Sequence, residues 1–339
     1  MSKYVINVMN QQQNIATSKA KDDVAYFLRS EGYSTIELPK FSGRIEKLLK
    51  TNNRITSNFK KLQAGDIFLM QYPSYLGYRF ERKLISYLKK RGVILIALVH
   101  DLDSIRLTDR RKQRTLSEEI FELNQMACVI TSNSKMDTLL KDKGLSVPTV
   151  VLGIFDYQHD ELINRSLKFE PKIVYAGNLN KAEFINDYPI NGVQFDIYGN
   201  ISKSKALPAN IKYFGSYPAT KIMNEFDGGF GLVWDGQSSH HIKGPFGEYL
   251  AYNNPHKLSL FLSSGMPVVI WRGAALASFV RDNNVGILVD SLDELPSVLT
   301  TVNEEQYKKM MLNSQKIAKK LVNGEYIKSA VTRAEKICN

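Results

Sequence analysis

Short apolar runs alternate with amphipathic segments along the first half of the chain. The runs have the length of buried strands, and the hydrophobic residues between them recur near the helical spacing. Strands separated by helices predict a parallel sheet with right-handed crossovers, and therefore a Rossmann-like layered fold. The predicted strands are 4-YVINVM-9, 33-YSTIEL-38, 66-DIFLM-70, 93-VILIALV-99, 128-CVIT-131 and 148-PTVVLG-153, and the predicted helices cover residues 18–30, 43–62, 77–91, 116–126 and 134–143.

The same alternation returns in the second half after an irregular polar stretch. Residues 154-IFDYQHDELINRSLKFEP-171 lack a clear apolar period and end in proline, so they are interpreted as a linker between domains over 1–153 and 172–320. The helical end of the chain, 321–339, is a candidate for a helix that packs back on the N-terminal domain. The second set of predicted strands is 172-KIVYAG-177, 193-VQFDIYG-199, 228-GGFGLVW-234, 267-PVVIW-271 and 285-VGILVD-290.

Two doubly wound α/β domains of similar size predict a cleft at the carboxyl ends of their strands. Loops and helix N-termini converge at that edge of a parallel sheet, and ligands bind there. Candidate chemistry is therefore sought in the loops that follow strands.

Composition narrows the classes of protein that the chain fits. Hydrophobic residues make up 43% and charged residues 23%, values that are typical of a folded globular protein. The sequence lacks an apolar run long enough to span a membrane and lacks a signal-peptide pattern at its start, so a cytoplasmic protein is expected. Cys128 and Cys338 are too few for a disulfide framework and lack metal-ligand spacing.

Basic residues exceed acidic ones by 45 to 34, which gives a formal charge of +11. Much of the excess lies in 40-KFSGRIEKLLKTNNRITSNFKK-61, 79-RFERKLISYLKKR-91 and 106-RLTDRRKQR-114. Solvated helix faces account for these runs, because hydrophobic residues recur among the charges near helical spacing. A phosphate-bearing or membrane-proximal acceptor would also suit such a surface. Nucleic acid is not expected as a partner, because aromatic residues are not interleaved with the basic runs.

The loop after the first predicted strand, 10-NQQQNIATSKAKDD-23, contains no glycine. A dinucleotide fingerprint needs glycines for its tight turn and for close approach of the pyrophosphate, so an NAD-dependent enzyme is not expected. Thr17 or Ser18 is a candidate cap for the following helix. In the functional interpretation, Asn14, Ala16 and Thr17 line the cleft and contact a substrate.

The strand over 93–99 leads into 99-VHDLDSIR-106, which places His100 and Asp101 at the carboxyl edge of the sheet. A carboxylate beside an imidazole can take a proton from a hydroxyl, so either residue is a candidate general base. The structural alternative is that Asp101 or Asp103 caps the next turn and His100 is a buried histidine with satisfied hydrogen bonds. A third interpretation takes Asp101 and Asp103 as an acid pair that binds a divalent metal.

The segment 173-IVYAGNLNKAEF-184 predicts a strand, a turn at Gly177 and then a helix. Asn178 can donate to an anion, and Lys181 lies at the predicted helix start, where phosphate oxygens would be stabilised. An ordinary strand-to-helix turn is the alternative.

Two later loops carry further candidates. Tyr217, in 211-IKYFGSYPATKI-222, can present its ring or its backbone to a base. Lys243 lies in 235-DGQSSHHIKGPFGEY-249, a long polar loop of the kind that forms mobile lids.

The stretch 252-YNNPHKLSLFLSSGMPVVIW-271 predicts a helix followed by a strand. Asn253 or Asn254 is the expected cap, because proline is favoured in a first helical turn and Pro255 comes next.

Lys257 is then at a helix N-terminus. A lysine there is unfavourable for the helix dipole unless an anion binds beside it. Its ammonium and the backbone N–H groups of Leu258 and Ser259 are predicted to hold a diphosphate. The alternative is a solvent-facing lysine on a core helix.

Together with the two Rossmann-like halves, 173-IVYAGNLNKAEF-184 and 254-NPHKLSLFLSSGMPVVIW-271 resemble the GT-B glycosyltransferases, which use nucleotide sugars. More narrowly, 252-YNNPHKLSLFLSSGMPVVIW-271 and 97-ALVHDLDSIR-106 are similar to the bacterial galactofuranosyltransferase-like group. That group includes a streptococcal enzyme that adds glucose to O-linked N-acetylglucosamine (GlcNAc) on serine-rich-repeat adhesins. The likeness covers nearly the whole chain. It implies transfer of a hexose, glucose from UDP-glucose, to GlcNAc-modified Ser or Thr of such an adhesin.

The resemblance also assigns roles to residues. It implies a donor site in the C-terminal domain and an acceptor site in the N-terminal domain. The nucleotide-diphosphate role falls on Lys257 and Asn254, with support from Asn178, Tyr217 and Lys243. A homo-oligomer, such as a tetramer, is implied as well.

One part of the family pattern is missing. Many GT-B enzymes carry two glutamates before the G-x-P-V step, and here Tyr252 and Leu260 stand at those positions. The usual carboxylate contact to the ribose hydroxyls is therefore absent, which leaves ribose binding and the stereochemical course open. The predicted substrate-binding residues are Asn14, Ala16, Thr17, Asn178, Tyr217, Lys243, Tyr252, Asn254, Lys257, Leu258 and Ser259.

The expected mechanism is direct glycosyl transfer. The helix N-terminus and Lys257 would stabilise the charge on the leaving diphosphate, so no metal or other cofactor is expected. If the reaction inverts the anomeric carbon, Asp101 or His100 is the candidate base.

Several other functions remain open. One is a galactofuranosyl or other sugar transferase of cell-surface polysaccharide synthesis. Another is a metal-dependent glycosyltransferase with a single Rossmann domain, which would leave the second α/β half unexplained. A third is a noncatalytic module that binds nucleotides or nucleic acid.

Overall fold

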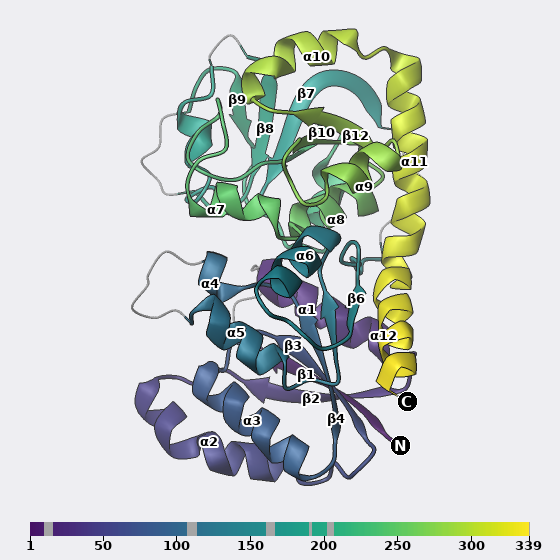
Figure 1. The fold of residues 1–339 in the computed structure, drawn as a ribbon. Helices are drawn as coiled ribbons and strands as arrows, with labels where there is room; N and C mark the ends of the chain where they lie inside the picture. The colour runs from purple at the N-terminus through teal and green to yellow at the C-terminus, as the bar shows by residue number, and fades with distance from the viewer. Residues whose placement is uncertain (10–15, 107–113, 161–166, 190–191, 202–206, 339) are drawn as a thin grey trace. The chain divides into compact units, whose positions relative to one another are not determined.

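The structure, a computed structural model, describes residues 1–9, 16–106, 114–160, 167–189, 192–201 and 207–338. It divides into two compact units, each built around its own parallel sheet (Figure 1). The first unit contains the N-terminal strand, Thr17–Gly153 and the chain from Tyr326 onward, and the second contains Ile154–Glu325. The segment interpreted as a linker, 154–171, lies in the second unit.

The strands of the first unit overlap the apolar runs predicted for them. They are β1 (Lys3–Met9), β2 (Tyr33–Pro39), β3 (Ile67–Tyr72), β4 (Ile94–Val99), β5 (Cys128–Thr131) and β6 (Thr149–Val151). Their order in the sheet is β2-β1-β3-β4-β5-β6, and every pair is parallel. The prediction succeeds because strands buried on both faces are continuous apolar segments.

Helices connect these strands and follow the predicted amphipathic segments. Two of them have side-chain caps: Thr115 forms a capping box with Glu118 on α5, and the Asn133 side chain accepts from the Met136 N–H on α6. The helices are α1 (Ala16–Arg29), α2 (Arg44–Phe59), α3 (Tyr78–Lys90), α4 (Asp103–Arg106), α5 (Leu116–Leu123) and α6 (Ser134–Asp142).

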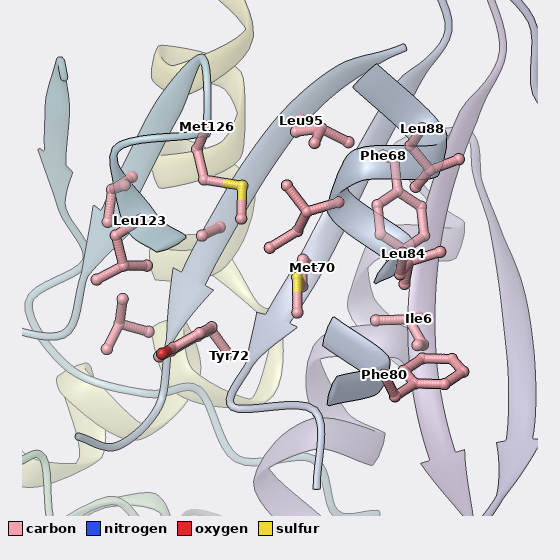
Figure 2. Packing of buried hydrophobic residues seen from close by; sticks show 14 of the residues in the cluster. Ile6, Phe68, Met70, Tyr72, Phe80, Leu84, Leu88, Leu95, Leu123 and Met126 are labelled. Carbon is pink, nitrogen blue, oxygen red and sulfur yellow. The ribbon is translucent and has the colours of Figure 1, made fainter. Parts of the chain in front are cut away.

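The main core of the first unit lies between the sheet and four of these helices (Figure 2). Phe68 of β3 lies beside Leu84 and Leu88 of α3, and Leu123 of α5 lies near Met126. Further members come from α2 and α6. All of these side chains are nearly inaccessible to water, and burying one such side chain stabilises a protein by about 1.5–3 kcal/mol.

A helix from the end of the chain completes the first unit. Helix α12 (Glu325–Cys338) contributes Glu335, whose carboxylate accepts from Lys3 Nζ and from the Tyr33 hydroxyl, both at 2.7 Å. Arg333 of the same helix donates to the Val151 carbonyl at 2.8 Å. The first unit is therefore assembled from both ends of the chain.

The second unit repeats the architecture with a different strand order. Its strands are β7 (Lys168–Ala176), β8 (Gln194–Tyr198), β9 (Ile211–Tyr213), β10 (Gly228–Val233), β11 (Val268–Trp271) and β12 (Gly286–Val289). They form a parallel sheet in the order β12-β11-β10-β7-β8-β9. The two parallel sheets confirm the α/β class predicted from the sequence.

Helices of the second unit are short except near the C-terminus. The α-helices are α7 (Pro245–Glu248), α8 (His256–Ser263), α9 (Ala277–Asp282), α10 (Leu295–Thr301) and α11 (Glu304–Val322). Short 3-10 helices are η1 (Glu183–Asn186), η2 (Ile222–Glu225), η3 (Tyr249–Ala251) and η4 (Leu292–Glu294). Within the described residues, no helix is long and apolar enough to cross a membrane.

The local predictions differ from the structure at several places. The segment after β7 forms turns and η1 instead of an α-helix, because Asn178 Oδ1 accepts from the Asn180 N–H and stabilises a turn. Helix α1 already begins at Ala16, so Thr17 and Ser18 lie inside its first turn and do not precede it as caps. Strand β9 was not predicted.

Candidate functional site

The strand order of the second unit points to the carboxyl ends of β7 and β10. The chain runs outward from β7 through β8 to β9 and then returns to pair β10 with the other side of β7. In open α/β sheets, ligands bind in the crevice at such a switch point. Gly177 directly follows β7, and Trp234 and Asp235 directly follow β10.

Lys257, in the first turn of α8, reaches both of these strand ends. Its Nζ lies 2.5 Å from Asp235 Oδ1 and 3.4 Å from the Trp234 carbonyl oxygen. The ammonium also lies 4.9 Å from the centre of the Tyr175 ring, which suits a cation–π contact. In the structure the anionic partner of the Lys257 ammonium is thus the Asp235 carboxylate, where the sequence predicted a bound diphosphate.

Tyr175 and Gly177 shape the space around this lysine. A Cβ atom at position 177 would lie 3.2 Å from Lys257 Cε and 3.4 Å from the Tyr175 hydroxyl oxygen. Burial, reinforced by the charge of Asp235, raises the pKa of Tyr175 well above its usual value. The phenol therefore stays protonated and donates to Asp235 Oδ1 at 3.4 Å.

The start of α8 differs from the prediction. The helix begins at His256 with Pro255 in the N-cap position, and it has no side-chain cap, so the predicted cap by Asn253 or Asn254 is wrong. The physical reason is that Pro255 itself has the extended backbone of a cap residue, with φ −66° and ψ 122°. The Leu258 N–H donates to the Pro255 carbonyl at 2.9 Å and is therefore already engaged within the first turn.

The side chains of Leu258 and Ser259 face the interior. Both are buried, and Ser259 Oγ donates to the Phe155 carbonyl at 2.7 Å. They fix α8 in the unit, while Lys257 reaches the loops after β7 and β10.

Gly199, at the end of β8, packs against the turn at Gly177. Its φ is +138°, and a Cβ atom there would lie 1.8 Å from the Gly177 carbonyl oxygen. Its N–H donates to the Gly215 carbonyl at 2.8 Å. The ends of β7, β8 and β9 are thus joined through three glycines.

Gly199→Ala is expected to destabilise the second unit by about 2–3 kcal/mol, because both the backbone conformation and the collision oppose a Cβ atom. Gly215→Ala is the matched control: φ is +95°, but no atom lies within 4 Å of its Cβ position. It should cost only about 1 kcal/mol. Urea unfolding of the two variants compares these losses directly. Equal losses would show that the packing against Gly177 is unimportant.

Two further predicted donor residues lie near these strand ends. Asn178 is exposed and follows Gly177 directly. Lys243 is exposed, and its carbonyl accepts from the Gln237 N–H at 3.0 Å, beside Gly236. Asn178 thus follows the Gly177 turn beside Lys257, and Lys243 lies next to Gly236, the residue after Asp235.

The other three predicted donor residues, Tyr217, Tyr252 and Asn254, also lie in the second unit. The Tyr217 ring is 6.1 Å from that of Tyr198, the last residue of β8. Tyr252 is half-buried just before α8, and Asn254 is nearly buried there. Leu260, at the second missing glutamate, is buried in α8. Leu260 therefore occupies a buried position, where a glutamate carboxylate would lose its contact with water.

In the first unit, the strand order reverses between β1 and β3. Lys21 of α1 lies at this point: its Nζ donates to the Gln71 carbonyl at 3.2 Å and also to the Pro73 carbonyl. It lies 4.1 Å from the centre of the Tyr75 ring. Burial lowers the pKa of Lys21 to about 7, although Asp101 and Asp103 oppose that shift.

The predicted base His100 is buried and bonded to Gln71. Its Nε2 lies 2.9 Å from Gln71 Oε1, while Gln71 Nε2 donates to the carbonyls of Ile6 and Lys21 at 2.9 and 3.1 Å. Because the amide of Gln71 uses its N–H groups on those carbonyls, its oxygen must accept from His100 Nε2. A neutral His100 therefore carries its proton on Nε2 and has Nδ1 as its basic nitrogen.

Asp101, the other predicted base, is held by two partners. Its Oδ2 accepts from Arg106 Nη1 at 2.7 Å and from the Tyr75 hydroxyl at 3.1 Å. Burial raises the pKa of Asp101, and Arg106 opposes that shift. Arg106 also binds Asp103 Oδ1 at 3.0 Å. The two carboxylates of the alternative metal-binding interpretation thus share one guanidinium.

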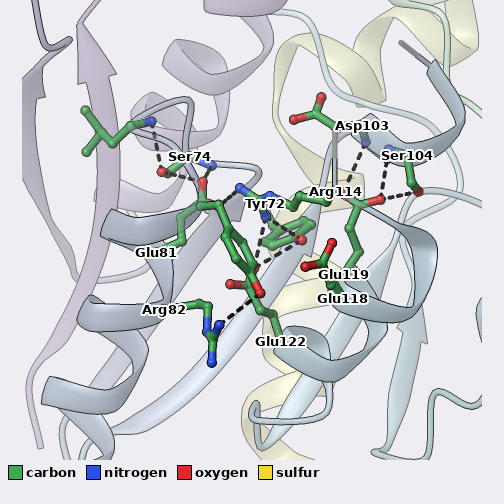
Figure 3. Close-up of polar contacts among 12 residues, drawn as sticks. Tyr72, Ser74, Glu81, Arg82, Asp103, Ser104, Arg114, Glu118, Glu119 and Glu122 are labelled. Atoms are coloured by element: carbon green, nitrogen blue, oxygen red, sulfur yellow. Dashed lines mark hydrogen bonds and ion pairs between the residues drawn. The ribbon is translucent and has the colours of Figure 1, made fainter. Parts of the chain in front are cut away.

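Buried glutamates hold the loops that carry these groups (Figure 3). Glu81 of α3 accepts from both the N–H and the hydroxyl of Ser74 at 2.6 Å, next to Tyr75. Glu119 of α5 accepts from the N–H groups of Asp103 and Ser104 at 3.1 Å and from the Ser104 hydroxyl. Buried carboxylates of α3 and α5 therefore hold the loops after β3 and β4 in place.

Arg114 balances these buried charges. Its guanidinium pairs with Glu81 and, at 2.9 Å, with Glu122, and it donates to the Tyr72 hydroxyl at 2.6 Å (Figure 3). Burial nevertheless raises the pKa of Glu122 to about 7.

The remaining predicted contacts lie at the start of α1. Asn14 lies outside the described residues, and Ala16 and Thr17 are described only as the first residues of α1.

Several residues of these clusters were not predicted. Asp235 and Tyr175 stand directly at predicted strand ends, so the rule that led to His100 and Asp101 could have found them. Lys21 and Tyr75 had no comparable signal, because one lies within a helix and the other within a turn.

Comparison with known families covers most of the chain. The sequence profile of the glucosyltransferase 3-like N-terminal domain matches residues 2–154, and that of the C-terminal domain matches residues 173–334. The β-1,6-galactofuranosyltransferase WbbI of Escherichia coli K12 is 28% identical over 97% of this chain and 97% of its own length. Glucosyltransferase 3 of Streptococcus gordonii is 24% identical over 93% of this chain and 92% of its own, and that of Streptococcus parasanguinis is 24% identical over the full length of both.

Solved structures share the fold at low sequence identity. Sucrose-phosphate synthase from Thermosynechococcus elongatus aligns over 99% of this chain and 98% of its own with a TM-score of 0.64 and 12% identity. Anabaena HepE in complex with UDP aligns over 99% and 100% with a TM-score of 0.62 and 13% identity. These likenesses confirm the GT-B fold. The profile matches on both domains, with the curated relatives, show that this nucleotide-sugar-dependent transferase belongs to the glucosyltransferase 3-like family.

Proposed function

We propose that this enzyme transfers a hexose, glucose from UDP-glucose, to GlcNAc-modified Ser or Thr of a serine-rich-repeat adhesin. The observation that carries the donor part is the position of Lys257, which reaches the ends of β7 and β10 at the switch point of the second sheet. A UDP-bound relative of the same fold, HepE, supports UDP as the nucleotide.

Lys257 would act by an exchange of partners. Its ammonium pairs with Asp235, on the partly exposed side of the switch point. A diphosphate that enters there offers more negative charge and more acceptor oxygens than one carboxylate, so the ammonium would move to it. The same ammonium then offsets the charge that develops on the departing UDP, which is why the proposal needs no metal ion.

We assign the base that takes the proton of the acceptor hydroxyl to the first unit. The two candidate bases are His100, which is bonded to Gln71 through Nε2, and Asp101. Asp101 forms an ion pair with Arg106, so its Oδ2 is already engaged, although burial raises the pKa of this carboxyl. The acceptor site is accordingly proposed near the ends of β3 and β4.

A second candidate is galactofuranosyl transfer in cell-surface polysaccharide synthesis. It is favoured by the 28% identity to WbbI, which exceeds the 24% identity to the two glucosyltransferases. A homo-oligomer and a cytoplasmic location remain predictions.

Donor and acceptor panels test the proposal. Titration calorimetry with UDP, with and without EDTA, should give the same affinity in both cases. The enzyme is then incubated with UDP-glucose, UDP-galactose or UDP-galactofuranose and a GlcNAc-serine peptide, and the product mass is measured. Glucose transfer to the peptide is the expected result. Transfer from UDP-galactofuranose to a galactoside acceptor alone would support the second candidate, and UDP binding that EDTA abolishes would contradict the metal-free donor site.

A further inference from the structure

Helices α2 and α3 form an outer face of the first unit. This face carries aliphatic side chains that do not pack into the core of the unit. They lie side by side (Figure 1). Helix α2 buries Thr51, Ile55 and Phe59 against the unit. Its first turns nevertheless expose three large aliphatic side chains: Ile45 is 76% exposed, Leu48 56% and Leu49 71%. Clustered exposed aliphatic residues of this kind mark an interaction surface.

The exposed residues continue into a groove between the two helices. The groove has a volume of about 790 Å³, and Asn52, Thr56, Arg79, Arg82, Lys83 and Lys90 are among the residues that line it. Ile45, Leu49, Asn52 and Thr56 follow one another at spacings of four, three and four residues, so they lie along one line of α2. The aliphatic side chains therefore extend the α2 wall of the groove.

The α3 wall of the groove is basic. It carries Arg79, Arg82, Lys83 and Lys90, and the acidic residue of this helix, Glu81, is buried on the opposite side with Ser74 and Arg114. On α2 the acidic residue is Glu46, which is already bound by Lys50 and Arg54. The face as a whole thus combines exposed cations with exposed aliphatic groups.

We propose that this face, Arg44–Phe59 with Tyr78–Lys90, docks on an anionic lipid bilayer. The cations would contact lipid phosphates, and Ile45, Leu48 and Leu49 would enter the boundary between headgroups and acyl chains, as in interfacial amphipathic helices. A second copy of the chain is a poorer partner, because a two-fold contact would place this basic face against itself. A soluble anionic polymer would bind the cations but would give the three aliphatic side chains nothing apolar to contact. The proposal does not rest on the identity of the donor or acceptor.

Cosedimentation of the full chain with lipid vesicles tests this face. Vesicles of phosphatidylcholine with phosphatidylglycerol should bind the protein, binding should weaken as salt rises, and vesicles of phosphatidylcholine alone should bind little. Arg79→Gln with Lys90→Gln should lower the vesicle affinity by about 25-fold at low salt, at roughly fivefold for each cation. Ile45→Ser with Leu49→Ser should lower it by about tenfold.

Matched controls come from α11, where the same residue types are exposed. Leu312→Ser, at a side chain that is 46% exposed, and Lys308→Gln with Lys309→Gln should leave vesicle binding unchanged. Circular dichroism confirms that each variant is folded. Absence of vesicle binding would overturn the proposal. So would vesicle binding that depends on the cations but not on the aliphatic residues, because it would show that Ile45 and Leu49 do not enter the bilayer. A loss of self-association in Ile45→Ser with Leu49→Ser would also overturn it, because it indicates a second copy of the chain.

Discussion

Lys257→Met should lower the affinity for UDP by about 100-fold or more, which corresponds to roughly 2.7 kcal/mol. The expected loss is large because a charge-assisted hydrogen bond to a diphosphate contributes more than a neutral one, and the methionine keeps most of the volume of the lysine. The side chain would still fill the space beside Tyr175 and Gly177. Titration calorimetry measures the affinity, and kcat/KM with UDP-glucose should fall at least as far.

Two further variants separate binding from structure. Lys221→Met changes an exposed lysine of the same unit and should leave UDP affinity unchanged. Asp235→Asn removes the partner of Lys257 but leaves its ammonium, so UDP should still bind. If Asp235→Asn and Lys257→Met lose UDP to the same extent, the pair has a structural role and the donor-site proposal fails.

Arg114→Met should destabilise the first unit by about 3–5 kcal/mol, because removal of one partner leaves buried carboxylates without their counter-charge. Glu81 and Glu122 are both almost inaccessible to water, and Arg114 contacts both. Thermal unfolding followed by circular dichroism measures the loss. Arg82→Met, at an exposed arginine of α3, is the matched control and should change stability by less than about 0.5 kcal/mol.

The loss in Arg114→Met should also depend on pH. The pKa of Glu122 is about 7 in the folded protein and near its usual 4.5 when unfolded. Folding therefore takes up a proton between these values, and the contribution of Glu122 to stability falls as pH rises through that window. Without Arg114 the charged form of Glu122 is less stable still. The loss of stability relative to wild type should therefore be larger at pH 8 than at pH 5.5. A pH-independent difference would show that Glu122 is not the group responsible.

The strands could be predicted well because the property that identifies them is contained in a few consecutive residues. A strand buried on both faces of a parallel sheet is a continuous apolar run, and β3 and β4 have that composition. Strand β9 escaped prediction because it has three residues, of which Lys212 and Tyr213 are exposed. Its place in the sheet depends on pairing with β8, which a sequence pattern does not contain.

The candidate site could be predicted only in part. Lys257 could be singled out as a candidate because proline and lysine at a helix start have a local meaning. Its partner Asp235 lies 22 residues earlier in the chain, and their contact depends on how β10 and α8 are packed. The tautomer of His100 likewise depends on Gln71, from another strand. Roles that arise from such tertiary contacts cannot be derived from one segment alone.

Helix α12 has a consequence for the order in which the protein folds during synthesis. It bonds to β1, β2 and β6 through Lys3, Tyr33 and Val151, so the first unit needs residues made at opposite ends of translation. Nearly all of the second unit is the continuous segment Ile154–Glu325, which leaves the ribosome before the rest of α12 does. The domain that is synthesised first is therefore the one that is completed last, and until then its sheet lacks one of its covering helices.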